Sequence, residues 1–261
     1  MLFNQIVFGP IHSRRLGVSL GINLLPEDIK ICTFNCIYCE CGWGDEPAEA
    51  MHALPLHCGE TEQIIPVIEK KLQELKAQNI HLDSITYSGN GEPTMHPQFG
   101  EITKNLIRLR DRYFPQTIIT CLSNSTQLHR PDVIDALREI DNPIMKLDTG
   151  IQSTFELINK PFSKISVTEI CKALSEFHGN LTVQTLFLKG ELDNGVKIDN
   201  TTETEVSAWL DCLKIINPHT VMLYPIDRET PAKKLEKIEK NVLEKIAERV
   251  GELGIKALAY S

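Results

Sequence analysis

The sequence predicts an α/β fold, a partial (β/α)6 barrel of the TIM type that occupies residues 1–261 as one domain. Short apolar runs alternate with longer segments in which apolar residues recur every three or four positions. Such alternation of strands and amphipathic helices builds a parallel sheet through right-handed crossovers, and this sheet curls into a full or partial barrel. Of the 261 residues, 42% are hydrophobic, so the chain can bury the core that this fold requires.

The apolar runs give the expected strands of the barrel. Pro26 ends the first run because proline cannot donate to a strand ladder, and the turn residues from Ser88 to Gly91 end the second. Residues 1–17 precede the barrel as an N-terminal segment. The strands are expected at residues 18–25, 83–87, 117–122, 144–147, 181–188 and 220–224, with a further strand proposed at 255–259.

Amphipathic segments between these runs predict the helices. Ser166 with Glu169, and Thr202 with Glu205, have the spacing of capping boxes and open helices before and after strand 181–188. Residues from about 26 to 60 are expected to form a long loop. The other helices are expected at about 61–78, 99–113 and 133–137, and from Thr230-Pro231 to about Val250.

Polar residues follow the predicted strands where each one ends. Barrels of parallel strands place their chemistry at the carboxyl ends of the strands, so a functional site is expected along this edge. Its candidates are Cys32 to Cys39, Gly89 to Thr94, Ser123 and Asn124, Asp148, Lys189, and Tyr224 to Arg228.

Three of these candidates, Cys32, Cys36 and Cys39, have the spacing C-x3-C-x2-C in a loop. Three thiolates can hold a [4Fe–4S] cluster with one iron left open, and that iron can chelate the amino and carboxylate groups of S-adenosyl-L-methionine. Cys41 leaves a second interpretation open, a four-thiolate zinc site or a non-catalytic electron-transfer module, although structural zinc sites usually use a distant second pair of ligands. A second cluster on Cys41 and Cys58 is a further alternative.

The glycine-rich loop after the second strand is a candidate ligand loop. Its glycines let the backbone approach a ligand closely, so Gly91 and Glu92 are candidates for binding polar groups of a cofactor. A turn that needs glycine for its own geometry is the alternative.

Polar side chains on the later strands are candidates for binding a nucleoside or a substrate. Ser123 and Asn124 present donors and acceptors that suit ribose hydroxyls. Asp148 and Gln184 lie on neighbouring strands and could hold the nucleoside or the substrate. A turn or capping role is the alternative for the residues at strand ends.

The charge of the chain bears on its partners. The net charge of −8 and the pI of about 5.5 offer no broad basic field for a phosphate backbone, so a nucleic acid partner is unsupported, although it is not excluded. Arg14 and Arg15 form a compact basic patch that suits a carboxylate or phosphate of a substrate. A solvated N-terminal segment is the alternative.

The chain shows no targeting or membrane signal. Its start has no basic region followed by a long apolar run, and no run of about eighteen apolar residues occurs. We therefore expect a protein that is neither exported nor bound to a membrane. Eight cysteines in such a chain indicate a reducing compartment, and the cytoplasm fits.

Taken together, six segments resemble the radical SAM superfamily, and within it a group related to the wyosine-tRNA synthetase. These segments are Gly9 to Gly17, Cys32 to Cys39, Asn90 to Thr94, Lys146 to Asp148, Asp199 to Thr201 and Tyr224 to Arg228. The resemblance covers nearly the whole chain and implies a partial barrel of the radical SAM type. It implies an oxidoreductase that cleaves S-adenosyl-L-methionine at a [4Fe–4S] cluster to a 5′-deoxyadenosyl radical, which abstracts hydrogen from an unidentified substrate.

The resemblance also implies roles for single residues. Tyr38 is expected near the adenine, Gly91 and Glu92 near the methionine amine, and Ser123 and Asn124 near the ribose. An electron donor such as flavodoxin or ferredoxin is expected as a partner, with a small molecule, a peptide or a protein as the substrate. A radical activase, which places the radical on a partner protein, is an alternative.

Two features depart from the group that the chain resembles. Asn90 occupies one glycine position of the Gly-Gly-Glu-Pro-like stretch. The wyosine enzyme holds a second cluster on three upstream cysteines, binds pyruvate through a lysine and acts on tRNA, whereas no cysteine precedes Cys32 here and the chain is acidic. The wyosine reaction itself is therefore not expected.

Overall fold

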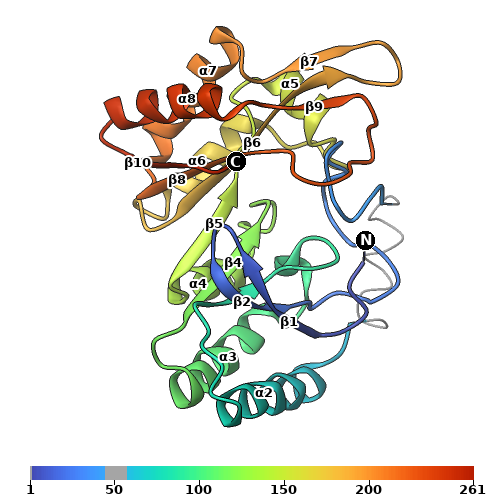
Figure 1. Ribbon diagram of the computed structural model, residues 1–261, viewed down its shortest axis with the longest axis vertical. Coiled ribbons are helices and arrows are strands. Elements are labelled where there is room, and N and C mark those ends of the chain that lie inside the picture. Colours follow the sequence, from blue (N-terminus) through green and yellow to red (C-terminus); the bar gives the residue numbers. More distant parts are fainter. Residues whose placement is uncertain (1, 45–57) are drawn as a thin grey trace. The chain divides into compact units, whose positions relative to one another are not determined.

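The computed structural model describes residues 2–44 and 58–261, which form two compact units (Figure 1). The first unit contains the chain up to Cys32 and Gly44–Pro143, and the second contains Thr33–Trp43 and Ile144–Ser261. Both units are built from strands that alternate with helices, so the predicted α/β class is confirmed. The expectation of a single domain stays a prediction.

In the first unit, a parallel sheet carries an antiparallel strand at its edge. Leu20 pairs with Ile85, and Ile85 pairs with Ile119, and all three side chains are buried. The strands, in sheet order, are β1 (Val7–Ser13), β2 (Gly17–Ile22), β3 (Ser84–Tyr87) and β4 (Ile118–Ser123). The helices are α2 (Thr61–Ala77), α3 (Phe99–Tyr113) and α4 (Pro131–Glu139), with the short 3-10 helix η1 (Pro93–Met95).

The second unit repeats this plan with a longer central strand. Its parallel strands, in sheet order, are β5 (Asn142–Lys146), β6 (Thr182–Glu191), β8 (Thr220–Pro225) and β10 (Lys256–Ala259). The far end of β6 pairs antiparallel with β7 (Lys197–Asp199) and β9 (Leu235–Lys237). The helices are α5 (Gln152–Ile158), α6 (Val167–Ser175), α7 (Glu203–Ile216) and α8 (Lys240–Glu252).

The two faces of the sheet in the second unit have different chemistry, because successive residues of a strand point to opposite faces. On one face, Trp209 of α7 packs edge-on against Phe187 with ring centroids 5.3 Å apart, and its Nε1 donates to Thr185 Oγ1 at 3.1 Å. Gln184 and Tyr224 occupy the opposite parity and therefore the opposite face. A polar row thus lies on the face that α7 does not cover.

Local side chains set several element boundaries. Asn23 ends β2 because its Nδ2 donates to the Leu25 carbonyl oxygen and its Oδ1 accepts from the Leu25 amide, which closes a turn. Ser166 and Glu169 form the predicted capping box of α6. Thr202 caps α7 by accepting from the amide three residues on.

The predicted helix from Thr230-Pro231 to Val250 is wrong in about its first half. Leu235–Lys237 is strand β9, and the helix begins only at Lys240. Backbone pairing of β9 with β6 and a hydrogen bond from the Ala232 amide to the Ile37 carbonyl oxygen hold this segment extended. Tertiary hydrogen bonds thus override a helical pattern. The strands β1, β7 and β9 and the helix α5 were not predicted.

Candidate functional site

The three cysteines of the C-x3-C-x2-C loop follow strand β2, and none of the eight cysteines forms a disulfide. Cys32 belongs to the first unit, whereas Cys36 and Cys39 belong to the second. Cys32 and Cys36 therefore have their neighbours in different units.

In the first unit, the side-chain amide of Asn124 faces the Cys32 sulfur. Asn124 Nδ2 lies 3.5 Å from Cys32 Sγ, and its Oδ1 accepts from the Thr126 amide at 3.1 Å and the Thr126 hydroxyl at 2.8 Å. These two bonds fix which end of the amide points at the sulfur. Asn124 is thus an N–H donor to a candidate cluster ligand.

Glu92 holds the end of β4 in place. Its carboxylate accepts hydrogen bonds from the Ser123 hydroxyl at 2.9 Å, the Asn124 amide at 2.6 Å, and both the amide and hydroxyl of Thr94. Burial raises the pKa of Glu92, and these donors oppose that shift. The Ser123 hydroxyl and the Glu92 carboxylate are therefore bonded to each other, and the expected places of Ser123 near the ribose and of Glu92 near the methionine amine stay predictions.

The glycine-rich loop approaches its neighbours closely. Gly91 has φ +140°, and a Cβ atom there would lie 1.7 Å from the Ile31 carbonyl oxygen. Ile31 and the loop exchange hydrogen bonds, since the Ile31 amide donates to Asn90 O and the Glu92 amide donates to Ile31 O, both at 2.9 Å. Glycine is thus required by contact with the segment that leads to Cys32.

The hydrogen bonds of Asn90 give a structural reason for asparagine at this position, where the related stretch has glycine. Its side chain is buried, and Nδ2 donates to the carbonyl oxygens of Phe3 and Pro26, at 2.8 and 2.7 Å. Its Oδ1 accepts from the Phe3 amide at 2.7 Å. Asn90 therefore ties the N-terminal segment and the start of the cysteine loop to the strand end.

In the second unit, Asn159 faces the Cys36 sulfur as Asn124 faces Cys32. Asn159 Nδ2 lies 3.5 Å from Cys36 Sγ and donates to Asp148 Oδ2 at 2.7 Å. Burial raises the pKa of the Cys36 thiol to about 11, while the Lys146 ammonium and the Asn159 hydrogen bond favour the thiolate. Asn159 follows α5, a helix that the sequence pattern did not predict, so no signal pointed to it.

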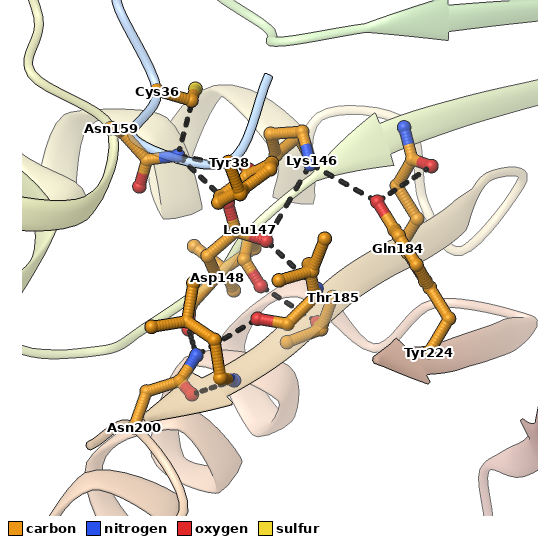
Figure 2. A network of polar contacts seen from close by, with 12 residues as sticks. Cys36, Tyr38, Lys146, Leu147, Asp148, Asn159, Gln184, Thr185, Asn200 and Tyr224 are labelled. Carbon is orange, nitrogen blue, oxygen red and sulfur yellow. Dashed lines mark hydrogen bonds and ion pairs between the residues drawn. The ribbon is translucent and has the colours of Figure 1, made fainter. Parts of the chain in front are cut away.

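Asp148 is the centre of the polar network in Figure 2. One carboxylate oxygen accepts from the Tyr38 hydroxyl and from Asn159, and the other accepts from the Leu186 amide at 2.9 Å. Burial, and then the neighbouring Asp148 carboxylate, raise the pKa of the Tyr38 hydroxyl. Asp148 therefore anchors the cysteine loop to the strand ends β5 and β6.

Asn200 braces the same strand ends from the segment after β7. Its Nδ2 donates to the carbonyl oxygens of Asp148 and Leu186, and its Oδ1 accepts from the Leu188 amide at 2.8 Å. Asn200 belongs to the Asp199 to Thr201 segment that the sequence singled out. Its structural role is to hold Asp148 and β6 in register.

Lys146, Gln184 and Tyr224 form a row on the face of this sheet opposite to α7 (Figure 2). Lys146 Nζ donates to the Tyr224 hydroxyl at 3.2 Å, and that hydroxyl donates to Gln184 Oε1 at 3.4 Å. Lys146 Nζ also lies 3.6 Å from Asp148 Oδ1. Desolvation lowers the pKa of Lys146, but Asp148 and Tyr224 raise it above the usual lysine value.

Arg14 and Arg15 lie elsewhere in the first unit. They occupy the turn between β1 and β2, where Ser13 Oγ accepts from the Arg15 and Leu16 amides at 3.3 and 3.2 Å. This turn precedes β2, whereas the cysteine loop follows its carboxyl end, about 17 Å further along the strand. Within the first unit, the two arginines therefore lie at the opposite end of β2 from the cysteine loop.

The other five cysteines are buried or partly buried outside the C-x3-C-x2-C motif. Cys58 packs against Leu25, Ile31 and Met95, and burial raises its pKa to about 11. Cys121, Cys171 and Cys212 are buried, and Cys41 is half-buried. Within residues 2–44 and 58–261, no three His, Cys, Asp or Glu side chains are grouped so that they could hold a single metal ion. A second cluster on Cys41 and Cys58 stays an untested prediction.

The donor set fits an iron–sulfur cluster. Cys32, Cys36 and Cys39 form no disulfide, and clusters are held by cysteine thiolates. Cys32 and Cys36 each face a side-chain N–H donor, and hydrogen bonds to the ligand sulfurs are one of the ways in which proteins tune clusters. No helix among the described residues is long and apolar enough to cross a lipid bilayer.

Comparison with known proteins identifies the family. Residues 27–198 match the family model described as the radical SAM superfamily. A UPF0026 protein of Helicobacter pylori is 34% identical over 233 residues, which are 87% of this chain and 68% of that protein. The printed name of this relative gives its family and no activity.

Solved structures share the fold at low sequence identity. A radical SAM methyltransferase from Sphaerobacter thermophilus superimposes with a TM-score of 0.64 over 93% of this chain and 65% of that one, at 14% identity. The structure of TYW1 with a lysine-pyruvate adduct bound gives a TM-score of 0.57 over 90% of this chain and 73% of that one, also at 14% identity. The predicted α/β fold of the partial TIM-barrel type is thereby confirmed. The chain belongs to the radical SAM superfamily.

Proposed function

We propose that this chain is an enzyme that binds one [4Fe–4S] cluster through Cys32, Cys36 and Cys39. When bound, such a three-cysteine cluster leaves one iron open to S-adenosyl-L-methionine and supplies the electron that cleaves it to a 5′-deoxyadenosyl radical, which abstracts hydrogen from the substrate. The observation that carries the proposal is the C-x3-C-x2-C loop, in which Cys32 and Cys36 each face an asparagine N–H donor.

The surrounding residues would hold the ligands of this loop and bind the cofactor. Asn124 is oriented by Thr126, and Asn159 is oriented by Asp148, so the N–H groups at the two sulfurs are fixed before any cluster binds. Tyr38 stays assigned to the adenine by resemblance. Because the Tyr38 hydroxyl donates to Asp148, the adenine would contact the Tyr38 ring rather than its hydroxyl.

The predicted contacts at the first strand ends need one refinement. Of the four hydrogen bonds that the Glu92 carboxylate accepts, three go to Oε1 and one goes to Oε2, so Oε2 keeps acceptor capacity. We therefore assign the methionine amine to Glu92 Oε2 and to backbone groups of Gly91. Ser123 and Asn124 stay assigned to the ribose by resemblance.

Partners follow from this chemistry. An electron donor such as flavodoxin or ferredoxin would reduce the cluster, and the substrate is a small molecule, a peptide or a protein. A radical activase would in addition form a stable complex with its partner protein.

The test uses protein reconstituted with iron and sulfide without oxygen. With dithionite or reduced flavodoxin and S-adenosyl-L-methionine, it should release 5′-deoxyadenosine slowly even without substrate, since the open iron alone permits cleavage. Liquid chromatography of the quenched mixture measures the product. A fully loaded protein that makes none with either reductant, or one that binds zinc in place of iron, would favour the electron-transfer or zinc module.

A further inference from the structure

An open groove of about 920 Å³ lies in the second unit, where helices α5 and α6 meet the cysteine loop. Apolar and charged side chains line it together. None of the site residues described above belongs to this lining. The lining includes Asn35 of the cysteine loop, Glu156 of α5, Lys160, Phe162 and Lys164 of the segment between the helices, and Glu169 of α6.

One wall of the groove is bonded to the cysteine loop along its length. The Asn35 amide donates to the carbonyl oxygens of Asn159 and Lys160, both at 3.0 Å, and the Phe162 amide donates to the Thr33 carbonyl oxygen at 3.1 Å. Lys160 has a left-handed backbone, with φ +43°. A lysine keeps this strained conformation only where the surrounding contacts impose it. The wall is therefore rigid and fixed to the loop.

This wall leads directly to a candidate cluster ligand. Asn35 is covalently joined to Cys36, and Asn159, the neighbour of Lys160 in the chain, holds its Nδ2 3.5 Å from the Cys36 sulfur. Electron transfer between two redox groups slows steeply as their separation grows, so a carrier protein must approach the cluster closely. The groove offers a carrier an open surface one residue away from a ligand.

Trp43 adds an exposed aromatic side chain beside the groove. It is 47% exposed, and Lys160 Nζ lies 5.0 Å from the centre of its ring. Tryptophan is usually well buried, and it is enriched among the interface residues that contribute most to binding. The cation–π contact orders both side chains before a partner arrives, which lowers the entropic cost of binding.

The lysines are the charges of the groove that a partner can engage. Both Lys160 and Lys164 are exposed, and neither pairs with a carboxylate in the part of the chain that the structure describes. The carboxylates are held within the protein, since Glu156 accepts from Gln152 Nε2 at 2.9 Å and Glu169 belongs to the α6 capping box. A chain of net charge −8 repels an acidic protein elsewhere, so two accessible lysines would direct such a partner here.

We propose that this groove, together with Trp43, is the docking site of an acidic electron-carrier protein that reduces the cluster. The inference deepens the proposed function and rests on it. In each encounter the carrier loses one electron and the cluster gains one, and no covalent bond forms or breaks. Electron-transfer complexes use small interfaces, below about 1,200 Å², so one groove with one aromatic anchor is sufficient.

The experiment compares protein carriers with a small reductant on the reconstituted holoenzyme. Photoreduced flavodoxin and photoreduced ferredoxin are the carriers, and dithionite, which needs no docking surface, is the reference. Release of 5′-deoxyadenosine from S-adenosyl-L-methionine is measured against carrier concentration. The variant combines Lys160→Glu with Lys164→Glu. Its matched control combines Lys245→Glu with Lys256→Glu, because these lysines of α8 and β10 are exposed and do not line the groove.

In the groove variant, kcat/KM for at least one carrier should fall about tenfold or more, while release driven by dithionite matches wild type. The control variant should match wild type with every reductant. Trp43→Ala should show the same selective loss. The proposal is overturned if the groove variant responds to both carriers as wild type does, or if neither carrier supports release by a wild-type protein that dithionite activates.

A footprint of wild type decides the matter if circular dichroism shows that the variants are unfolded. Acetylation of lysines, read by mass spectrometry, should decrease at Lys160 and Lys164 when saturating flavodoxin or ferredoxin is added, and should stay constant at Lys245 and Lys256. Equal protection of all four lysines, or of none, would contradict docking in the groove. The footprint needs no turnover, and release driven by dithionite is scored separately, so failure of the radical chemistry and failure of the docking site are distinguishable.

Discussion

The Nδ2 atom of Asn159 lies 3.5 Å from the sulfur of Cys36. The same nitrogen donates to Asp148 at 2.7 Å, so a buried carboxylate determines that the amide presents its N–H groups, and not its oxygen, to the sulfur. Asn124 and Cys32 repeat the relationship at the same distance in the other unit. Two of the three candidate ligands thus have a prearranged hydrogen-bond donor.

Replacing Asn159 by leucine should lower the reduction potential of the cluster. An N–H bond to a ligand sulfur stabilises the additional negative charge of the reduced cluster, and leucine cannot donate one. Electron paramagnetic resonance during a redox titration measures the midpoint. Asn241→Leu, an exposed position on α8, is the control. An unchanged midpoint in a fully loaded Asn159→Leu protein would show that the contact does not act on the cluster.

Replacing single cysteines should separate ligands from bystanders. Cys36→Ala, purified without oxygen, should lose iron, sulfide and visible absorbance, because a cluster with two protein ligands is poorly held. Cys41→Ala should keep all three. Equal losses in both variants would make Cys41 a ligand and would favour the four-thiolate interpretation. Iron and sulfide assays with absorption spectra give the result.

Gly91→Ala should destabilise the protein by at least about 2 kcal/mol, because a methyl group would overlap the Ile31 carbonyl oxygen at 1.7 Å and the φ of +140° disfavours alanine. Gly195→Ala is the matched control. Gly195 has φ +80° with no atom within 4 Å of an added Cβ, so it should cost only the backbone strain, about 1–2 kcal/mol. Urea denaturation of both variants measures the difference. Equal costs would mean that the loop relaxes around the methyl group.

Much of the fold could be predicted because each barrel strand carries its own apolar run. The strands near 84, 118, 182 and 220 follow such runs, and their ends give the candidate residues by position alone. Strand β9 could not be predicted, because its partner β6 is far away in the sequence and supplies the hydrogen bonds that hold it extended.

The internal partners of the site residues could not be predicted either. The sequence places Ser123 and Asp148 at strand ends, where a ligand role and a structural role look alike. Only the structure reveals that Glu92 binds Ser123 and that Tyr38 binds Asp148. Asn159 was missed for a related reason, since it follows the short helix α5 rather than a strand.

The stability of the protein should depend on pH through Glu92, which is 2% exposed. Burial raises its pKa above the ordinary 4.5, so the folded protein holds the proton more tightly than the unfolded chain does. The stabilising contribution is therefore complete below about pH 4.5 and is lost as the pH rises through the folded pKa. Glu92→Gln has no proton to lose, so the free energy of unfolding of wild type minus that of Glu92→Gln should fall as the pH rises above 4.5.

Glu169→Gln provides a control of opposite sign for this prediction. Hydrogen bonds from the Ser166 hydroxyl and amide lower the pKa of Glu169, so its contribution is present above the ordinary pKa and is lost as the pH falls. Wild type minus Glu169→Gln should therefore rise with pH. Urea denaturation between pH 4 and 8 measures both differences, and ionisations common to wild type and variant cancel. If the Glu92 difference also rises with pH, its four donors outweigh burial, and the carboxylate is held ionised at the end of β4.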